Sequence, residues 1–150
     1  MSGTCRRWLT AGLALLILLT LCFIWGNSLE SRADSKEKSL GVLDRLRPLL
    51  ELVVGKGNAT DHLVRKLAHF TEFGALGGEL ALLLALRRRM GLQGLANCLF
   101  AGLCAAVTDE ALQLLSDRGS QVQDVLLDFG GVFAGVAVVA VVAVMWRRRK

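Results

Sequence analysis

The sequence predicts an all-α integral membrane protein: an antiparallel four-helix bundle with an additional amphipathic helix in its first outer loop. Three observations lead to this fold class. Hydrophobic residues make up 53% of the 150 residues, and the mean hydropathy of +0.49 is too high for an ordinary soluble domain. Four apolar runs are each long enough to cross a bilayer. Tight basic clusters flank those runs. We therefore expect one membrane domain over residues 1–150, with the lipid bilayer as its main partner.

The first apolar run covers about residues 8–26 and follows Arg6 and Arg7. A charged start and an apolar core also describe a secretory signal peptide. This run is long for a signal core, and no convincing small-x-small cleavage site follows it closely. We interpret it as an uncleaved first transmembrane helix.

Residues 27–62 form a polar segment that predicts an amphipathic helix in the first outer loop. Within it, apolar side chains recur at helical spacing opposite charged ones, which is typical of a helix on a membrane surface. They are Leu43, Leu46, Leu50 and Val53. Pro48 predicts a kink or a restart. Thr60 or Asp61 is a candidate N-cap for the next helix.

Three further spans are expected at about residues 63–86, 92–115 and 125–146. The connections after the second and third spans are shorter than ten residues, so consecutive spans must be antiparallel neighbours.

Basic clusters predict the orientation in the membrane. They lie near both ends of the chain and between the second and third spans, at 6–7, 87–89 and 147–150. Such clusters hold helix ends in the cytoplasm. Both termini are therefore expected in the cytoplasm of a multi-pass cell-membrane protein, with residues 27–62 and 116–124 outside. The basic residues are not interleaved with aromatic ones on a common face, which argues against nucleic-acid binding.

The predicted spans contain six acidic or histidine residues, and a seventh directly precedes the fourth span. They are His69, Glu72, Glu79, Asp109, Glu110, Asp124 and Asp128. A charge at bilayer depth is costly, so such side chains normally face the bundle interior and mark a site. Six of the seven lie toward the outer ends, Glu79 being deeper, and helical phase aligns them in stripes that should face one another. The stripe of the fourth span continues into Gly131 and Gly135, which allow a neighbouring helix to approach closely.

Four uses of this polar layer are consistent with the residues. It could only hold the helices together, or it could recognise a phosphate or carboxylate head group through Lys66 and Arg118. It could hydrolyse or transfer a group with His69 as general base beside an acidic residue, although no convincing nucleophile stands out. It could carry a metal or protons, but a single histidine argues against a zinc cage. We favour recognition, and we expect no bound metal and no cofactor.

At these positions the chain resembles the VanZ-like family of small membrane proteins. The resemblance rests on three ordered motifs: Arg65-Lys66-x-x-His69-Phe70-x-Glu72-Phe73, then Asp109-Glu110-x-x-Gln113, and finally Arg118 with Asp124-Val125-x-x-Asp128-x-x-Gly131. Trp25 to Ser28 and Lys38-Ser39 are also similar to the family's first outer loop, so the resemblance extends from about residue 12 to 142. Asp128 departs from the family pattern, which commonly has asparagine there.

The resemblance implies a multi-pass bacterial plasma-membrane protein. The family's namesake is associated with resistance to the glycopeptide antibiotic teicoplanin. Carried over position by position, the motifs imply eight binding residues: Lys66, His69, Glu72, Asp109, Glu110, Gln113, Arg118 and Asp124. The expected ligand is a lipid-linked cell-wall precursor or another anionic envelope lipid, to be bound or modified.

Overall fold

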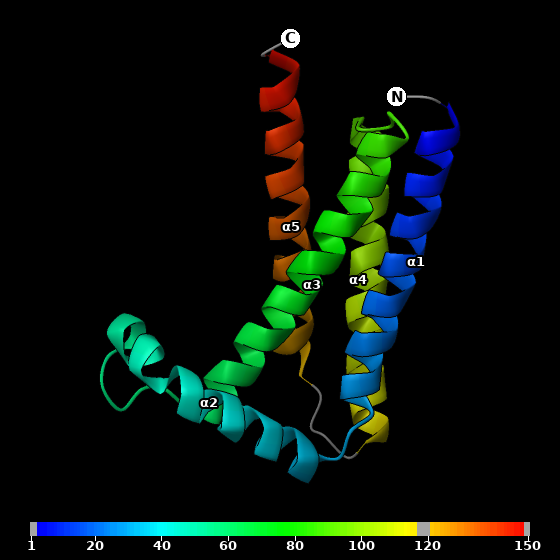
Figure 1. Cartoon of the computed structure of the whole chain (residues 1–150). Helices are drawn as coiled ribbons and strands as arrows, with labels where there is room; N and C mark the ends of the chain where they lie inside the picture. Colours follow the sequence, from blue (N-terminus) through cyan, green and yellow to red (C-terminus); the bar gives the residue numbers. More distant parts are fainter. Residues whose placement is uncertain (1–2, 117–120, 149–150) are drawn as a thin grey trace.

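A computed structural model describes residues 3–116 and 121–148 of the chain, with the side chains of 147 and 148 left aside. The described residues form five helices and no strand. The helices are α1 (Gly3–Ser28), α2 (Arg32–Val54), α3 (Asp61–Leu86), α4 (Leu92–Leu115) and α5 (Val122–Arg148). Four of them, all but α2, are long and apolar enough to cross a membrane (Figure 1). The protein is thus an all-α protein with four candidate membrane spans.

The helix limits differ from the expected spans mainly at the ends. The third expected span and α4 coincide. α1 begins at Gly3, five residues before the apolar run; residues 3–7 contain no proline, and Arg6 and Arg7 are good helix formers. α3 begins at Asp61 because the Thr60 side chain accepts a hydrogen bond from the Leu63 amide at 3.2 Å. That bond makes Thr60, one of the two candidates, the N-cap.

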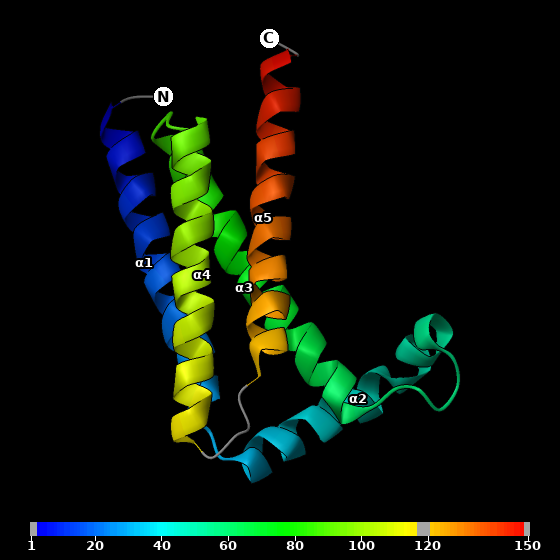
Figure 2. The ribbon, with the colours of Figure 1, turned by 180° about the vertical axis from the view of Figure 1, so that it is seen from behind.

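The spans run alternately in the two directions. α1 and α4 descend in Figure 1, whereas α3 and α5 ascend. The start of α1, the α3–α4 connection and the end of α5 therefore lie at one end of the molecule. α2 and the start of α5 lie at the other end, as the view from behind also makes clear (Figure 2).

Glycines bring α3 and α5 into the most extensive helix–helix contact of the structure. A Cβ atom at Gly135 would lie 2.0 Å from the Gly74 carbonyl oxygen, and one at Gly131 would lie 2.4 Å from the Phe70 carbonyl oxygen. From the other side, a Cβ atom at Gly77 would lie 2.2 Å from the Val132 carbonyl oxygen. The predicted close approach at Gly131 and Gly135 is confirmed, and α3 is the neighbour that approaches.

A narrow apolar core lies between the spans, and many large apolar side chains point outward. Phe73 and Leu76 of α3, Ile24 of α1 and Val132 of α5 are buried in that core. Outward-facing side chains such as Phe100 of α4 remain largely exposed. With spans of this length and composition, the outward apolar surface implies a lipid bilayer as its surroundings.

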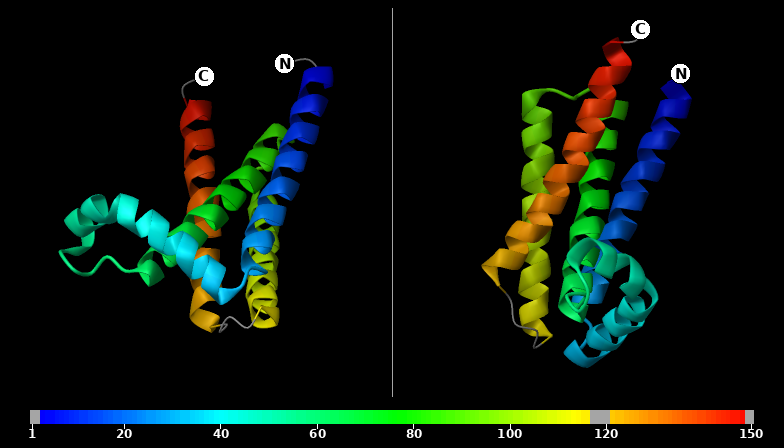
Figure 3. Two further views of the ribbon diagram at one scale, coloured as in Figure 1. Left: turned by 60° about the horizontal axis from the view of Figure 1, so that its bottom comes forward. Right: turned by 90° about the vertical axis from the view of Figure 1, so that its left-hand side faces the viewer.

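α2 leaves the bundle and packs only partly against it. Leu43 is buried with Ala59 and Val64 near the start of α3, and Leu50 packs against the same cluster. Leu46 and Val53, which belong to the predicted stripe, are exposed. The helix bends along its length and extends sideways from the spans (Figure 3). Pro48 lies inside it, where the missing amide hydrogen removes one helical hydrogen bond, so the predicted kink fits better than a restart.

Candidate functional site

A polar cavity of about 540 Å³ lies among α2, α3, α4 and α5, at the end of the molecule opposite the termini. Its size is in the usual range of small-molecule sites. All of its lining residues but Leu127 are polar: Arg32, Lys36, Asp61, His62, Arg65, Lys66, His69, Glu110, Gln113, Gln121, Asp124 and Asp128. Exposed lining residues such as Lys36 and His62 show that it opens at this end.

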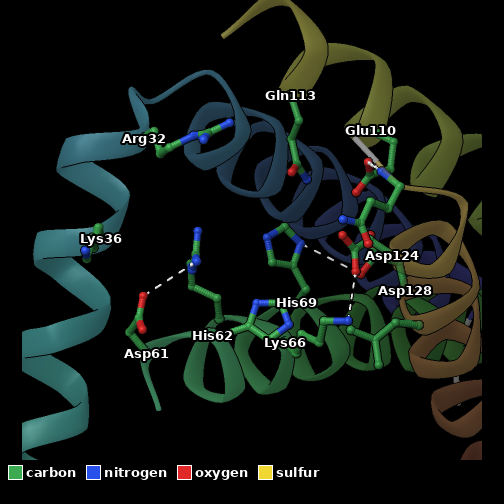
Figure 4. A pocket seen from close by; sticks show the side chains of 13 residues that line it. Arg32, Lys36, Asp61, His62, Lys66, His69, Glu110, Gln113, Asp124 and Asp128 are labelled. Carbon is green, nitrogen blue, oxygen red and sulfur yellow. Dashed lines mark hydrogen bonds and ion pairs between the residues drawn. The ribbon is translucent and has the colours of Figure 1, made fainter. Parts of the chain in front are cut away.

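The cavity has a basic side and an acidic side (Figure 4). Arg32 and Lys36 of α2 lie on one side, and Glu110 of α4 with Asp124 and Asp128 of α5 on the other. Arg32 and Lys36 are four residues apart, so they share one face of their helix. Such a division sets up an electrostatic gradient across the cavity.

The first turns of α3 lie between these two sides. Lys66 Nζ is 3.2 Å from Asp124 Oδ1, which links α3 to α5. Arg65 pairs with Asp61 of its own helix at 3.6 Å. Both pairs are partly exposed, so each contributes little to stability and can rearrange around a ligand.

Asp109 lies behind the cavity rather than on its surface and is fully buried. Its Oδ1 accepts a 2.6 Å hydrogen bond from the Ser28 hydroxyl of α1, and its Oδ2 accepts one of 2.8 Å from Gln113 Nε2. The Ser116 hydroxyl in turn donates to the Ser28 carbonyl at 2.9 Å. These bonds fix the Asp109 carboxylate in one orientation and connect α1 to α4.

His69 faces two buried carboxylates. Its Nδ1 lies 3.6 Å from Asp109 Oδ2 and 3.7 Å from Asp128 Oδ1. Asp128 is 1% exposed, and neither of its oxygens accepts a hydrogen bond from any group in the described part of the chain. One ligand atom from each of the three residues lies within 4.8 Å of the others, a spacing that could hold a metal ion.

Glu110 completes the acidic side and is also buried, at 3% exposure. Its Oε2 accepts a hydrogen bond of 3.2 Å from the Gln121 amide, close to the start of α5. Its Oε1 has no hydrogen-bond partner among residues 3–116 and 121–148. The acidic side therefore combines fixed carboxylate oxygens with others that are buried and unpartnered.

The structure brings seven of the eight predicted site residues together. Five line the cavity: Lys66, His69, Glu110, Gln113 and Asp124. Glu72 lines a smaller adjoining cavity of about 170 Å³, which shares Arg65 and His69 with the first. Asp109 supports the site from behind, and Arg118 lies outside the described residues.

The basic residues of α2 were not among the predicted site residues. Arg32 and Lys36 line the cavity, and their four-residue spacing was the available signal. His62 also lines the cavity. It lies one turn before Lys66 on α3, a spacing that could have identified it. Nothing in the sequence indicated Gln121, because its hydrogen bond to Glu110 is a tertiary contact between α4 and the residue that precedes α5.

Among the described residues, the arrangement offers a base but no obvious nucleophile. His69 beside Asp109 resembles a general base with its orienting carboxylate, although 3.6 Å exceeds a normal hydrogen bond. The Ser116 hydroxyl donates to backbone carbonyls of Ser28 and Gln113. Its role in this arrangement is therefore structural. Ser120 lies outside the described residues. The charged side chains that line the cavity can contact a charged group.

The fold and the cavity define a small multi-pass membrane protein with a polar site at one end of its helices. The family model of VanZ/LLP1 matches residues 13–144, and the chain belongs to this family. Neither the curated proteins nor the solved structures contain a match.

Proposed function

We propose that the protein binds the anionic head group of a lipid-linked or anionic envelope component in the polar cavity. In this proposal the four apolar helices form an antiparallel transmembrane bundle, and α2 lies as an amphipathic helix at the outer membrane surface. The termini are cytoplasmic and the cavity faces outward, because the basic clusters gather at the opposite end. The cavity then opens at the depth of lipid head groups.

The basic side of the cavity is the observation that carries the proposal. Arg32 and Lys36 extend from α2 over a cavity whose other side is acidic. A phosphate needs cationic donors, and arginine binds its oxygens with a fixed fork of N–H groups. The acidic side can accept hydrogen bonds from hydroxyl or amine groups attached to the same head group. An ordinary hydrophobic ligand pocket would have neither the cationic donors nor the carboxylate acceptors.

The exposed apolar face of α2 supports the proposed surface position. Val42, Leu46, Leu49 and Val53 recur at helical spacing and are exposed. They lie beside Leu43 and Leu50, two residues of α2 that pack near the start of α3. An apolar face next to charged residues is typical of a helix that lies in the membrane interface. α2 would thereby hold Arg32 and Lys36 at head-group level.

The test is phosphate-dependent lipid binding by the purified full-length protein. Native mass spectrometry would compare a polyisoprenyl phosphate with the neutral polyisoprenol of the same length. We expect an adduct with the phosphate alone, and about 10- to 100-fold weaker binding in Arg32→Gln, because a hydrogen bond to a charged group contributes about 1.5–3 kcal/mol. Arg45→Gln is the matched control, since Arg45 is an exposed arginine of α2 that does not line the cavity.

Two results would contradict head-group recognition. One is equal binding of the neutral polyisoprenol, which would mean that the chain binds only the hydrocarbon tail. The other is equal loss of binding in Arg32→Gln and Arg45→Gln, which would indicate a nonspecific charge effect. The association with teicoplanin follows from the family resemblance alone and stays a prediction for this chain.

A further inference from the structure

We propose that His69, Asp109 and Asp128 bind a divalent cation at the buried end of the cavity. The three residues come from α3, α4 and α5, so the cation would join three spans at one point. It would be held by one imidazole nitrogen and carboxylate oxygens. The sequence alone argued against a metal, because one histidine cannot build a zinc cage. The three-dimensional arrangement supplies the missing ligands from carboxylates instead.

The two distances from His69 Nδ1 are slightly longer than those between ligand atoms around a common ion. Atoms about 2.1 Å from one cation lie about 3.0 Å apart at right angles and about 3.4 Å apart at tetrahedral angles. His69 Nδ1 lies 3.6 Å from Asp109 Oδ2 and 3.7 Å from Asp128 Oδ1. Both separations are too long for a direct hydrogen bond. For a cation between His69 Nδ1 and these two oxygens, each of the two separations would shorten by a few tenths of an ångström.

The state of Asp128 is the second, independent observation. Its carboxylate is 99% buried, and neither oxygen has a hydrogen-bond partner in the described ranges. Buried carboxylates are normally paired or bound to a metal. The two α3 cations nearest in sequence to His69 already pair elsewhere, Lys66 with Asp124 and Arg65 with Asp61. A cation beside His69 would give Asp128 the partner that these side chains do not provide.

The surroundings of Asp109 are those of a supported metal ligand. Ser28 and Gln113 donate to its two oxygens, and each carboxylate oxygen retains a further lone pair. Ligating carboxylates are commonly held in place by such outer hydrogen bonds. Glu110, the other buried carboxylate of α4, has an unpartnered Oε1 on the same side of the cavity. It is available as a fourth ligand or as a partner of a metal-bound water.

The donor set selects the class of ion. Carboxylate oxygens with one imidazole nitrogen suit Mn²⁺ among the divalent cations, whereas thiolate-preferring ions find no cysteine in the cluster. This inference goes beyond head-group binding and does not depend on it, because the ion would bind without lipid. A bound cation would also attract a phosphate into the cavity. The phosphate would then be held by the cation on the acidic side and by Arg32 on the basic side.

The test is Mn²⁺ binding by the full-length protein in detergent, after removal of metals with a chelator. Electron paramagnetic resonance would measure free Mn²⁺ during a titration, and pulsed measurements would detect nitrogen coupling to the bound ion. We expect about one bound Mn²⁺ per chain, with coupling to one imidazole nitrogen. Asp128→Asn keeps the shape of the side chain and should weaken binding at least 10-fold. Glu79→Gln is the matched control, since Glu79 is a partly buried carboxylate deeper in α3 with an unpartnered oxygen of its own.

The two histidines of the chain provide a second comparison that does not depend on affinity. His69→Gln should abolish the nitrogen coupling, whereas His62→Gln should retain it. Absence of saturable Mn²⁺ binding by the folded wild-type protein would overturn the proposal. So would nitrogen coupling that persists in His69→Gln, or an Asp128→Asn variant that binds as tightly as Glu79→Gln. Lipid is absent from every arm, so failure here leaves head-group binding to its own test.

Discussion

Replacing Gly135 by alanine should separate α3 from α5. The new Cβ atom would lie 2.0 Å from the Gly74 carbonyl oxygen and 2.7 Å from the Gly78 amide nitrogen. Carbon and carbonyl oxygen approach no closer than about 3.3 Å in ordinary contacts. The shortfall is about 1.3 Å, and both obstructing atoms belong to backbone, so no side chain can rotate to make room. The helices themselves must move.

The expected cost is about 1–3 kcal/mol of unfolding free energy, the usual range for overpacking, with the upper part more appropriate for a backbone clash. The displacement should also disturb the site, because Lys66–Asp124 and His69–Asp128 both cross from α3 to α5. We therefore expect lower stability together with weaker head-group binding.

The assay is reversible unfolding in detergent, followed by circular dichroism, for Gly135→Ala and for Gly12→Ala. Gly12 is the matched control because it lies in the span α1 and a Cβ atom there meets nothing within 4 Å. Alanine at position 12 should be neutral or slightly stabilising, since alanine favours helix more than glycine does. Equal stability of the two variants would refute the close α3–α5 crossing.

Two further predictions concern the buried network and the orientation. Ser28→Ala leaves Asp109 Oδ1 without its 2.6 Å hydrogen bond and should cost about 1–3 kcal/mol in the same unfolding assay. Thr108→Val, which removes only an exposed bond within its own helix, should change stability by less than about 0.5 kcal/mol; similar values for both would mean that the network does not stabilise the bundle. In a cysteine-free background, cysteine at exposed position 56 should react with an impermeant reagent added outside intact cells, and cysteine at exposed position 89 should not. The reverse pattern would invert the proposed topology.

The sequence determined the spans because bilayer thickness and hydropathy act locally. Four apolar runs, one capping residue and a proline were enough to predict the helices to within a few residues at most ends. Helical phase also predicted which polar side chains would converge, since lipid offers such groups no partners. His69, Glu110 and Asp124 come from three helices and line one cavity for that reason.

Packing between the helices sets which of these residues reach the cavity and which support it from behind. Asp109 and Glu110 are adjacent in sequence, yet only Glu110 lines the cavity, while Asp109 is held by Ser28 from α1. Helical phase separates such neighbours by about 100° but does not say which helix each one meets. The position of α2 is likewise tertiary: Leu43 of this helix packs against Val64 of α3, and Arg32 and Lys36 of the same helix line the cavity. Local pattern specifies the elements and their polar faces; the distances between side chains on different helices arise only when glycine contacts and buried hydrogen bonds fix how those elements pack.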